Sequence, residues 1–173
     1  GLVGSEMCIR DSNNVHTYVI NDNENAPSIG FNLISSSNDE SVASQSIDVN
    51  LSSVSSKNIT VNYLATGTAT GSGTDYNLAN GTLTISPGEV TGTITITDIV
   101  DDSLDEANET VIITLSSPTN ASLGTDIVHT YTINDNDNAP AIGFNITSSK
   151  SDEPSPPINI TVDVSQISGR EIS

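Results

Sequence analysis

Acidic side chains gather in short clusters along this chain. The clusters lie at residues 39–40, 101–109, 135–137 and 152–153. Grouped carboxylates attract cations, and Ca²⁺ in particular takes six to eight oxygen ligands from carboxylates, amide groups and backbone carbonyls. Scattered acids would only add solubility, so their grouping is the feature that has to be explained. The first candidate chemistry is therefore the binding of a hard divalent cation.

The charge balance excludes two classes of partner. Four Lys and Arg stand against 22 Asp and Glu, which gives a formal net charge of −18 at pH 7. A chain this acidic is repelled by nucleic acid and by anionic membrane surfaces. It contains one Cys, so no intrachain disulfide can form. No segment approaches the roughly 18 apolar residues of a membrane-spanning helix.

A long internal repeat organises the chain. The segment VHTYVINDNENAPSIGFN, residues 15–32, returns as VHTYTINDNDNAPAIGFN at residues 128–145, an offset of 113 residues. The correspondence continues without a gap to residue 60 in the first copy and residue 173 in the second. A unit of this length has the size of a whole domain rather than of a short solenoid repeat.

The repeat divides the chain into four predicted parts. Residues 1–12 match nothing that follows and resemble translated sequencing adaptor, so we exclude them from fold reasoning as a non-native tail. Residues 13–25 are then the C-terminal end of a preceding unit. Residues 26–138 form one complete unit, and residues 139–173 begin a following unit that is truncated.

The complete unit is predicted to be all β. Apolar residues alternate with polar ones in short runs rich in Val, Ile and Thr, as in strands with one buried face. Turn signals such as Asn80–Gly81 and Pro87–Gly88 separate the runs. With the segment 29–34 counted as the first strand, the pattern predicts seven strands. About 110 residues in seven strands favour an antiparallel, immunoglobulin-like Greek-key sandwich of two sheets.

Four segments of the unit resemble the Calx-β domain, a calcium-binding sandwich. They are ITVNYLATGTATGSGTDY (59–76), GTLTISPGEVTGTITI (81–96), DDSLDEANETVIITLSSP (101–118) and YTINDND (131–137). The resemblance places calcium ligands in four loops at one end of the sandwich. Carried over residue by residue, the implied ligands are Glu40, Asp75, Asp101, Asp102, Glu106, Glu109, Asp135 and Asp137.

The partial neighbouring units supply equivalent acids. Asp22 and Glu24 would serve the preceding unit and Glu153 the following one. Two positions depart from the family pattern, because Asn136 and Ser103 stand where members often carry Asp. Fewer carboxylates imply fewer or weaker calcium sites. Gathering about eight carboxylates without a cation costs several kcal/mol of repulsion, so a bound ion explains the clusters better than a solvated surface does.

Parts of the sequence also fit other functions. The segment NDNDNAP, residues 134–140, also resembles the calcium-binding linker of cadherin repeats. A calcium-bridged carbohydrate-binding module and a regulatory sensor like those of sodium–calcium exchangers are further alternatives. An enzyme is not expected, because the acids recur with the repeat and the chain offers no aromatic cleft. The repeat copies His16 and His129 are expected to be half-buried structural residues rather than zinc ligands.

The sequence therefore predicts a calcium-binding structural module of a large extracellular or cell-surface protein. Calcium would order the acidic loops and fix the angle between neighbouring units. The expected partners are calcium ions, the neighbouring repeats of the same chain, and cell-surface or matrix ligands.

Overall fold

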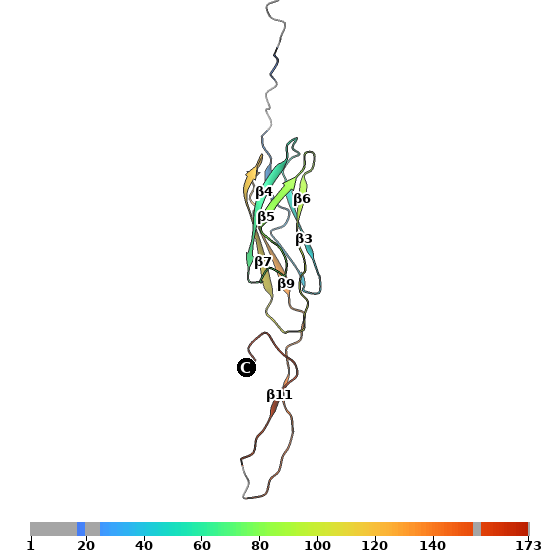
Figure 1. The fold of residues 1–173 in the computed structure, drawn as a ribbon, viewed down its shortest axis with the longest axis vertical. Coiled ribbons are helices and arrows are strands. Elements are labelled where there is room, and N and C mark those ends of the chain that lie inside the picture. The colour runs from blue at the N-terminus through green and yellow to red at the C-terminus, as the bar shows by residue number, and fades with distance from the viewer. Residues whose placement is uncertain (1–16, 20–24, 154–156, 173) are drawn as a thin grey trace, which may run out of the picture.

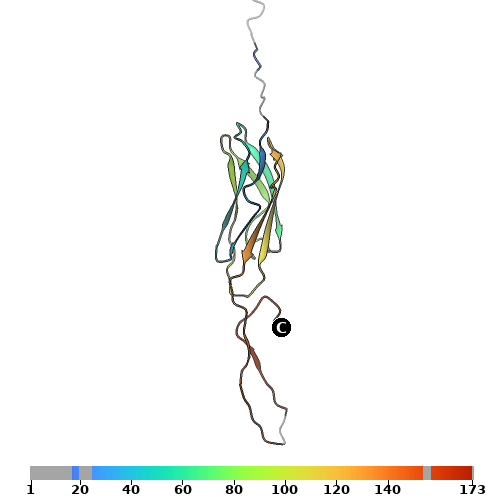
Figure 2. The same ribbon diagram turned by 180° about the vertical axis from the view of Figure 1, so that it is seen from behind.

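The computed structural model describes residues 17–19, 25–153 and 157–172. The expected tail (1–12), His16, Asp22 and Glu24 lie outside the described residues. Figures 1 and 2 show an elongated molecule in which a β-sandwich is followed, along the long axis, by a separate pair of strands. Among the described residues, no helix is long and apolar enough to cross a membrane.

Two sheets form the sandwich, as the alternating apolar pattern predicts. The first has four strands in the order β6 (Thr91–Ile96), β3 (Gln45–Leu51), β1 (Ser28–Phe31) and β8 (Ser122–Leu123). The second has five, in the order β2 (Ser35–Asp39), β9 (Val128–Asn134), β7 (Glu109–Thr119), β4 (Ile59–Gly67) and β5 (Gly81–Ile85).

The core lies between the two sheets and is made by alternate residues of the strands. Val49, Val61, Val111 and Tyr131 are fully buried, and their chain neighbours point outward or are only partly covered. This period of two is the signature of half-buried strands. It confirms the all-β sandwich predicted from the sequence.

The expected first strand, residues 29–34, ends instead at Phe31 as β1, and a separate strand, β2, begins at Ser35 in the other sheet. β1 pairs with β3, and the chain then crosses to the other sheet, where β2 pairs in parallel with β9. Leu33 and Ile34, at the crossing, are exposed at 61% and 64%. β1 also runs parallel to β8, so two pairs are parallel where an antiparallel arrangement was expected. The sequence SSSND of β2 has no apolar residue to mark it as a strand.

A further pair of strands follows the sandwich. β10 (Ile142–Phe144) and β11 (Val162–Val164) pair antiparallel. Their register, Ile142 to Val164 and Phe144 to Val162, equals that of Ile29 to Leu51 and Phe31 to Val49 in β1 and β3, displaced by 113 residues. The second copy of the repeat therefore builds the same local pairing as the first.

Candidate functional site

Acidic side chains gather at one end of the sandwich, where the chain leaves β9 toward β10. Five segments meet there: the ends of β2 and β9, the start of β7, and the loops before β5 and before β7. The loop before β7 and the start of β7 are continuous, so these segments carry the four loops that the resemblance placed at one end of the sandwich. They belong to segments as far apart as residues 40 and 137, so only the fold brings them together.

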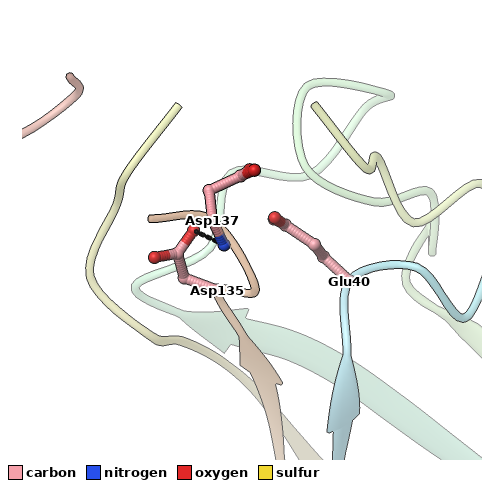
Figure 3. Close-up of side chains that lie close together, drawn as sticks. All are labelled: Glu40, Asp135 and Asp137. Atoms are coloured by element: carbon pink, nitrogen blue, oxygen red, sulfur yellow. Dashed lines mark hydrogen bonds between the residues drawn. The ribbon is translucent and has the colours of Figure 1, made fainter. Parts of the chain in front are cut away.

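Glu40, Asp135 and Asp137 form the tightest group. One carboxylate oxygen from each lies within 4.8 Å of the other two. Figure 3 shows the Glu40 side chain, from the end of β2, directed toward the side chains that follow β9. Glu40 is 7% exposed, and its Oε1 and the Oδ2 of Asp137 are buried without a hydrogen-bond partner. Buried polar atoms are normally bonded, so two unbonded carboxylate oxygens in one group of acids call for a partner.

Backbone pairing fixes this group in place. The parallel ladder of β2 and β9 ends with Asp39 opposite Asn134, and the Glu40 amide donates to the Asn134 carbonyl at 3.0 Å. The Asp135 amide donates to Asn108 Oδ1 at 3.2 Å, which ties the end of β9 to the loop before β7. The short polar strand β2 is thus the element that carries Glu40 to the acidic end.

A pocket beside this group collects further predicted ligands. Its walls include Thr74, Val100, Ala107 and Ile133, together with the carboxylates of Glu40, Asp75, Asp102, Glu106, Glu109 and Asp135. Six of the eight predicted ligands of the complete unit therefore line one hollow, and Asp137 joins it through its contact with Glu40 and Asp135.

Two predicted ligands lie elsewhere. Asp101 is exposed and is not part of the pocket wall; its Oδ1 accepts a hydrogen bond from Asn136 Nδ2 at 3.1 Å. Glu153, the repeat counterpart of Glu40, is exposed in the segment between β10 and β11. Asn136, which stands where the family often has Asp, thus holds the Asp101 side chain.

A glycine allows Asp75 to reach the site. Gly67, at the end of β4, has φ of 134°, and a Cβ there would lie 2.0 Å from the Thr110 carbonyl oxygen. This close approach pins the loop before β5 against the start of β7, where Ala69 N donates to the same carbonyl. Asp75 Oδ2 in turn accepts the Thr70 amide at 2.5 Å, which orients the carboxyl group.

The electrostatics of the site favour neutralisation. Burial raises the pKa of Glu40 to about 7, and the charges of Asp135, Asp102 and Asp137 add to the rise against an opposing backbone hydrogen bond from Asn136. Burial also raises the pKa of Glu109 to about 7, helped by its hydrogen bond to Asp75 and by the charge of Asp75. The pKa of Glu106 is raised by burial first and by the charge of Asp102 next. Burial, together with the neighbouring negative charges, thus makes the ionised form of these three carboxyl groups costly and raises each pKa.

His129 has a structural role. It was expected to be half-buried and is instead 2% exposed, on the same inward face as Tyr131. One ring nitrogen lies 2.6 Å from the Leu33 carbonyl, the other 2.8 Å from Ser36 Oγ, and the ring packs against Phe31 at 5.5 Å between centroids. Both ring nitrogens thus have a polar contact at the place where the chain crosses between the sheets.

Sequence reasoning left Asp105 without a role. It lies in the acidic loop before β7, is 8% exposed, and contacts Ser168 and Arg170 of the following segment. Nothing in the acidic run separates it from its neighbours. Its repeat copy falls outside the chain, and its partners are about 63 residues away.

Comparison with known proteins agrees with this geometry. Residues 22–137, well over half of the chain, match the model of the Calx-beta domain family. The chain belongs to the Calx-beta family. Domains of this family are calcium-binding β-sandwich modules with regulatory roles. No curated protein sequence matches the chain.

Solved Calx structures share the fold. The apo form of the Calx CBD1 domain is 25% identical, with a TM-score of 0.59 over 65% of this chain and 100% of that domain. The CBD12 structure from CALX1.2 is 23% identical, with a TM-score of 0.59 over 69% of this chain and 48% of that one. The Calx CBD2 domain is 17% identical, with a TM-score of 0.57 over 65% of this chain and 91% of that domain.

Proposed function

We propose that this Calx-beta unit binds calcium at the acidic end of its sandwich. The observation that carries the proposal is the Glu40 side chain, which is almost fully buried with an unbonded Oε1 and faces Asp135 and Asp137. A buried carboxylate oxygen without a partner is costly, whereas one that coordinates a cation is not. A Ca²⁺ ion would accept this oxygen as a ligand and remove the cost.

The donor set fits calcium rather than a softer metal. The ligands on offer are carboxylates, with backbone carbonyls nearby, and hard divalent cations prefer oxygen. The structure gathers more carboxylates than one ion needs to neutralise it, so we propose a first site at Glu40, Asp135 and Asp137. Asp75, Asp102, Glu106 and Glu109 extend it toward a second. Asp101 would act through the loop that also carries Asp102.

Coulomb repulsion supports the same conclusion. At an effective dielectric of about 20, two unit charges 4.8 Å apart, the outer limit for Glu40 and Asp135, repel by about 3 kcal/mol. That energy is relieved by protonation or by a cation. Because these side chains come from separate loops, calcium would order the loops as it binds. The acidic end would then be firm with calcium and looser without it.

We further propose that the unit belongs to a tandem array in an extracellular or cell-surface protein. Two observations support the array: the 113-residue repeat, and the register that β10 and β11 share with β1 and β3. Sites of extracellular modules commonly bind calcium at about 10⁻⁴–10⁻³ M, concentrations found outside cells. The array would serve adhesion, with neighbouring units and surface or matrix ligands as its partners. The match of residues 22–137 to the Calx-beta family favours this function over a cadherin or carbohydrate-binding function.

A regulatory sensor is the second candidate. It is favoured by the likeness to the Calx CBD1 domain, at 25% identity over the whole of that domain. The two functions differ in affinity. A sensor would saturate in the micromolar range, whereas the structural module would need calcium near millimolar.

Thermal unfolding of the full chain tests calcium binding. In about 10 mM calcium, which is about 100 times a Kd of 10⁻⁴ M, the midpoint is expected to rise by about 10 °C over that in chelator, since a ligand at 100 times its Kd adds about 2.7 kcal/mol. Asp135→Asn should lose most of this rise. Glu89→Gln is the matched control, because Glu89 lies in the exposed turn between β5 and β6. Equal midpoints with and without calcium would refute the proposal.

A further inference from the structure

The turn at residues 166–170 rests on the acidic loop of the complete unit. Ser168 Oγ lies 3.2 Å from both the carbonyl oxygen and Oδ2 of Asp105. The Gly169 amide donates to the same Asp105 carbonyl at 3.1 Å. Arg170 Nη1 lies 3.8 Å from Asp105 Oδ1. Three consecutive residues of the following segment therefore meet one acidic residue.

Close packing accompanies these bonds. Asp105 is 8% exposed, and Asp105 and Ser168 form a parallel β-bridge. A Cβ added to Gly169 would lie 2.7 Å from Glu106 Oε1, so the Glu106 side chain would have to shift to admit a larger residue there. Gln166 Nε2 also donates to the Asn138 carbonyl, which ties the turn to the connection between the two units. The contact thus combines backbone pairing, side-chain hydrogen bonds and close packing.

The same turn occurs in the complete unit. Ser168 and Arg170 correspond to Ser55 and Lys57 at the 113-residue offset. In both copies the Ser hydroxyl oxygen accepts a hydrogen bond from the backbone amide two residues later, at a nitrogen–oxygen distance of 3.0 Å. Two of the four Lys and Arg in a chain of net charge −18 thus stand at one repeat position, which sets that position apart.

The first copy of the turn faces the preceding part of the chain. Residues 54–57 line a hollow together with residues 25–27, where the chain enters the sandwich, and Asn120. Figure 1 places this end of the sandwich opposite the acidic end. Each unit would therefore present a basic turn at its entry and an acidic loop at its exit.

We propose that this contact is the recurring joint between neighbouring units. Asp105 receives the Ser168–Arg170 turn of the unit that follows, and the Ser55–Lys57 turn receives the equivalent acid of a unit that precedes. Asp105 is thereby a docking residue set within a loop of calcium ligands. This inference depends on the tandem array of the proposed function and not on calcium binding.

Amide hydrogen exchange of Gly169 in the full chain, followed by NMR in excess chelator, tests the joint. The Gly169 amide should be protected in the unaltered chain, because it donates to Asp105. Asp105→Ala should accelerate its exchange about tenfold, since the charge that pairs with Arg170 and the side-chain acceptor of Ser168 are both lost. Arg170→Ala should accelerate it about two- to fivefold, because the ion pair is partly exposed.

The repeat supplies a conservative variant. Lys stands at the equivalent position of the first copy, so Arg170→Lys should keep the protection that Arg170→Ala loses, and Arg170→Glu should lose more. Lys150→Ala is the matched control for removing a positive charge away from the joint. A Gly169 amide that is unprotected in the unaltered chain, or that is indifferent to both Asp105→Ala and Arg170→Ala, would overturn the proposal.

Calcium binding is separated by its own variant. Glu40→Gln should leave Gly169 protection in chelator unchanged while it weakens the thermal response to calcium. Loss of protection in Glu40→Gln without calcium would contradict a joint independent of the ion. Failure of calcium binding with an intact joint would refute only the calcium site.

Discussion

The first and second copies of the repeat form the same strand pair in two surroundings. In the first copy β1 and β3 lie inside a sandwich, with Ile29 1% exposed and Phe31 4% exposed. In the second copy the equivalent Ile142 is 52% exposed and Phe144 66% exposed. The register is nevertheless identical. Local sequence is therefore enough to specify pairing, whereas burial depends on strands that are distant in sequence.

The acidic residues of the two copies also differ in their surroundings. Glu40 and Glu153 stand at equivalent positions, yet Glu40 is buried against Asp135 and Asp137 while Glu153 is exposed. The difference is β9, which runs beside β2 and carries the two aspartates at its end. A ligand position in the sequence becomes a site only where the complete fold supplies its partners.

The largest expected effect is a difference in the free energy of unfolding between substitutions at Phe31 and at Phe144. Phe31→Ala should lower the free energy of unfolding by about 3–5 kcal/mol, because it removes a buried ring that also contacts His129. Phe144→Ala should change it by less than about 0.5 kcal/mol. Urea unfolding of both variants measures the difference. Similar losses in the two would show that the second copy is buried in solution.

The next largest effect concerns calcium. Glu40→Gln should weaken calcium binding by about tenfold or more, because it removes a charged ligand from the closest group of carboxylates. Glu153→Gln, its repeat counterpart, should leave the affinity unchanged. Calorimetric titration of the full chain measures both. An equal loss in the two variants would mean that the exposed copy also holds an ion.

A smaller effect is expected from pH. The folded pKa of Glu40 and of Glu109 is raised to about 7, well above the usual value near 4.5, so protons bind the folded state more tightly. In chelator, the stability gained from these protons is present at low pH and is lost as pH rises from about 4.5 through 7. Glu40→Gln should make the loss of stability with rising pH less steep, because the variant lacks one of the two titrating carboxyl groups.

Calcium provides the control for the pH effect. Metal binding competes with protons for the same carboxylates, so the decline toward pH 7 should shrink or reverse in millimolar calcium. Thermal midpoints from pH 4.5 to 7.5, with calcium and with chelator, measure both curves. Parallel curves would contradict a shared role of these groups in proton and calcium binding.

The comparison also shows what the sequence could predict. Ile47 and Val49, and likewise Val111 and Ile113, are apolar residues two positions apart, a spacing that predicts a strand with one apolar face. Both pairs are buried as expected. β2 was missed because SSSND lacks apolar residues and obtains its place only by pairing with β9. The acidic clusters are visible in the sequence itself, and resemblance to the family placed their loops at one end of the sandwich.

The role of Asp105 could not be predicted in the same way. Asp105 is contacted by a turn about 63 residues later in the chain. A contact between residues so far apart leaves no local pattern in composition or spacing. Asp101 also differs from expectation, because its side chain is held by Asn136 at the edge of the site rather than in the pocket. Such roles depend on side-chain partners that only the fold brings close.

The smallest expected effect tests whether backbone alone holds the register of the second copy. Asn145 Nδ2 donates to Asp163 Oδ2 at 2.6 Å, whereas the counterpart of Asp163, Asn50, accepts from Thr91 of the neighbouring β6. Asp163→Asn makes the second copy like the first. Because the amides of Asn145 and Ser165 still donate to the Thr161 and Ala141 carbonyls, their exchange rates should change by no more than about threefold. A larger change would show that this side-chain pair, and not the backbone ladder common to both copies, fixes the pairing where no sandwich surrounds it.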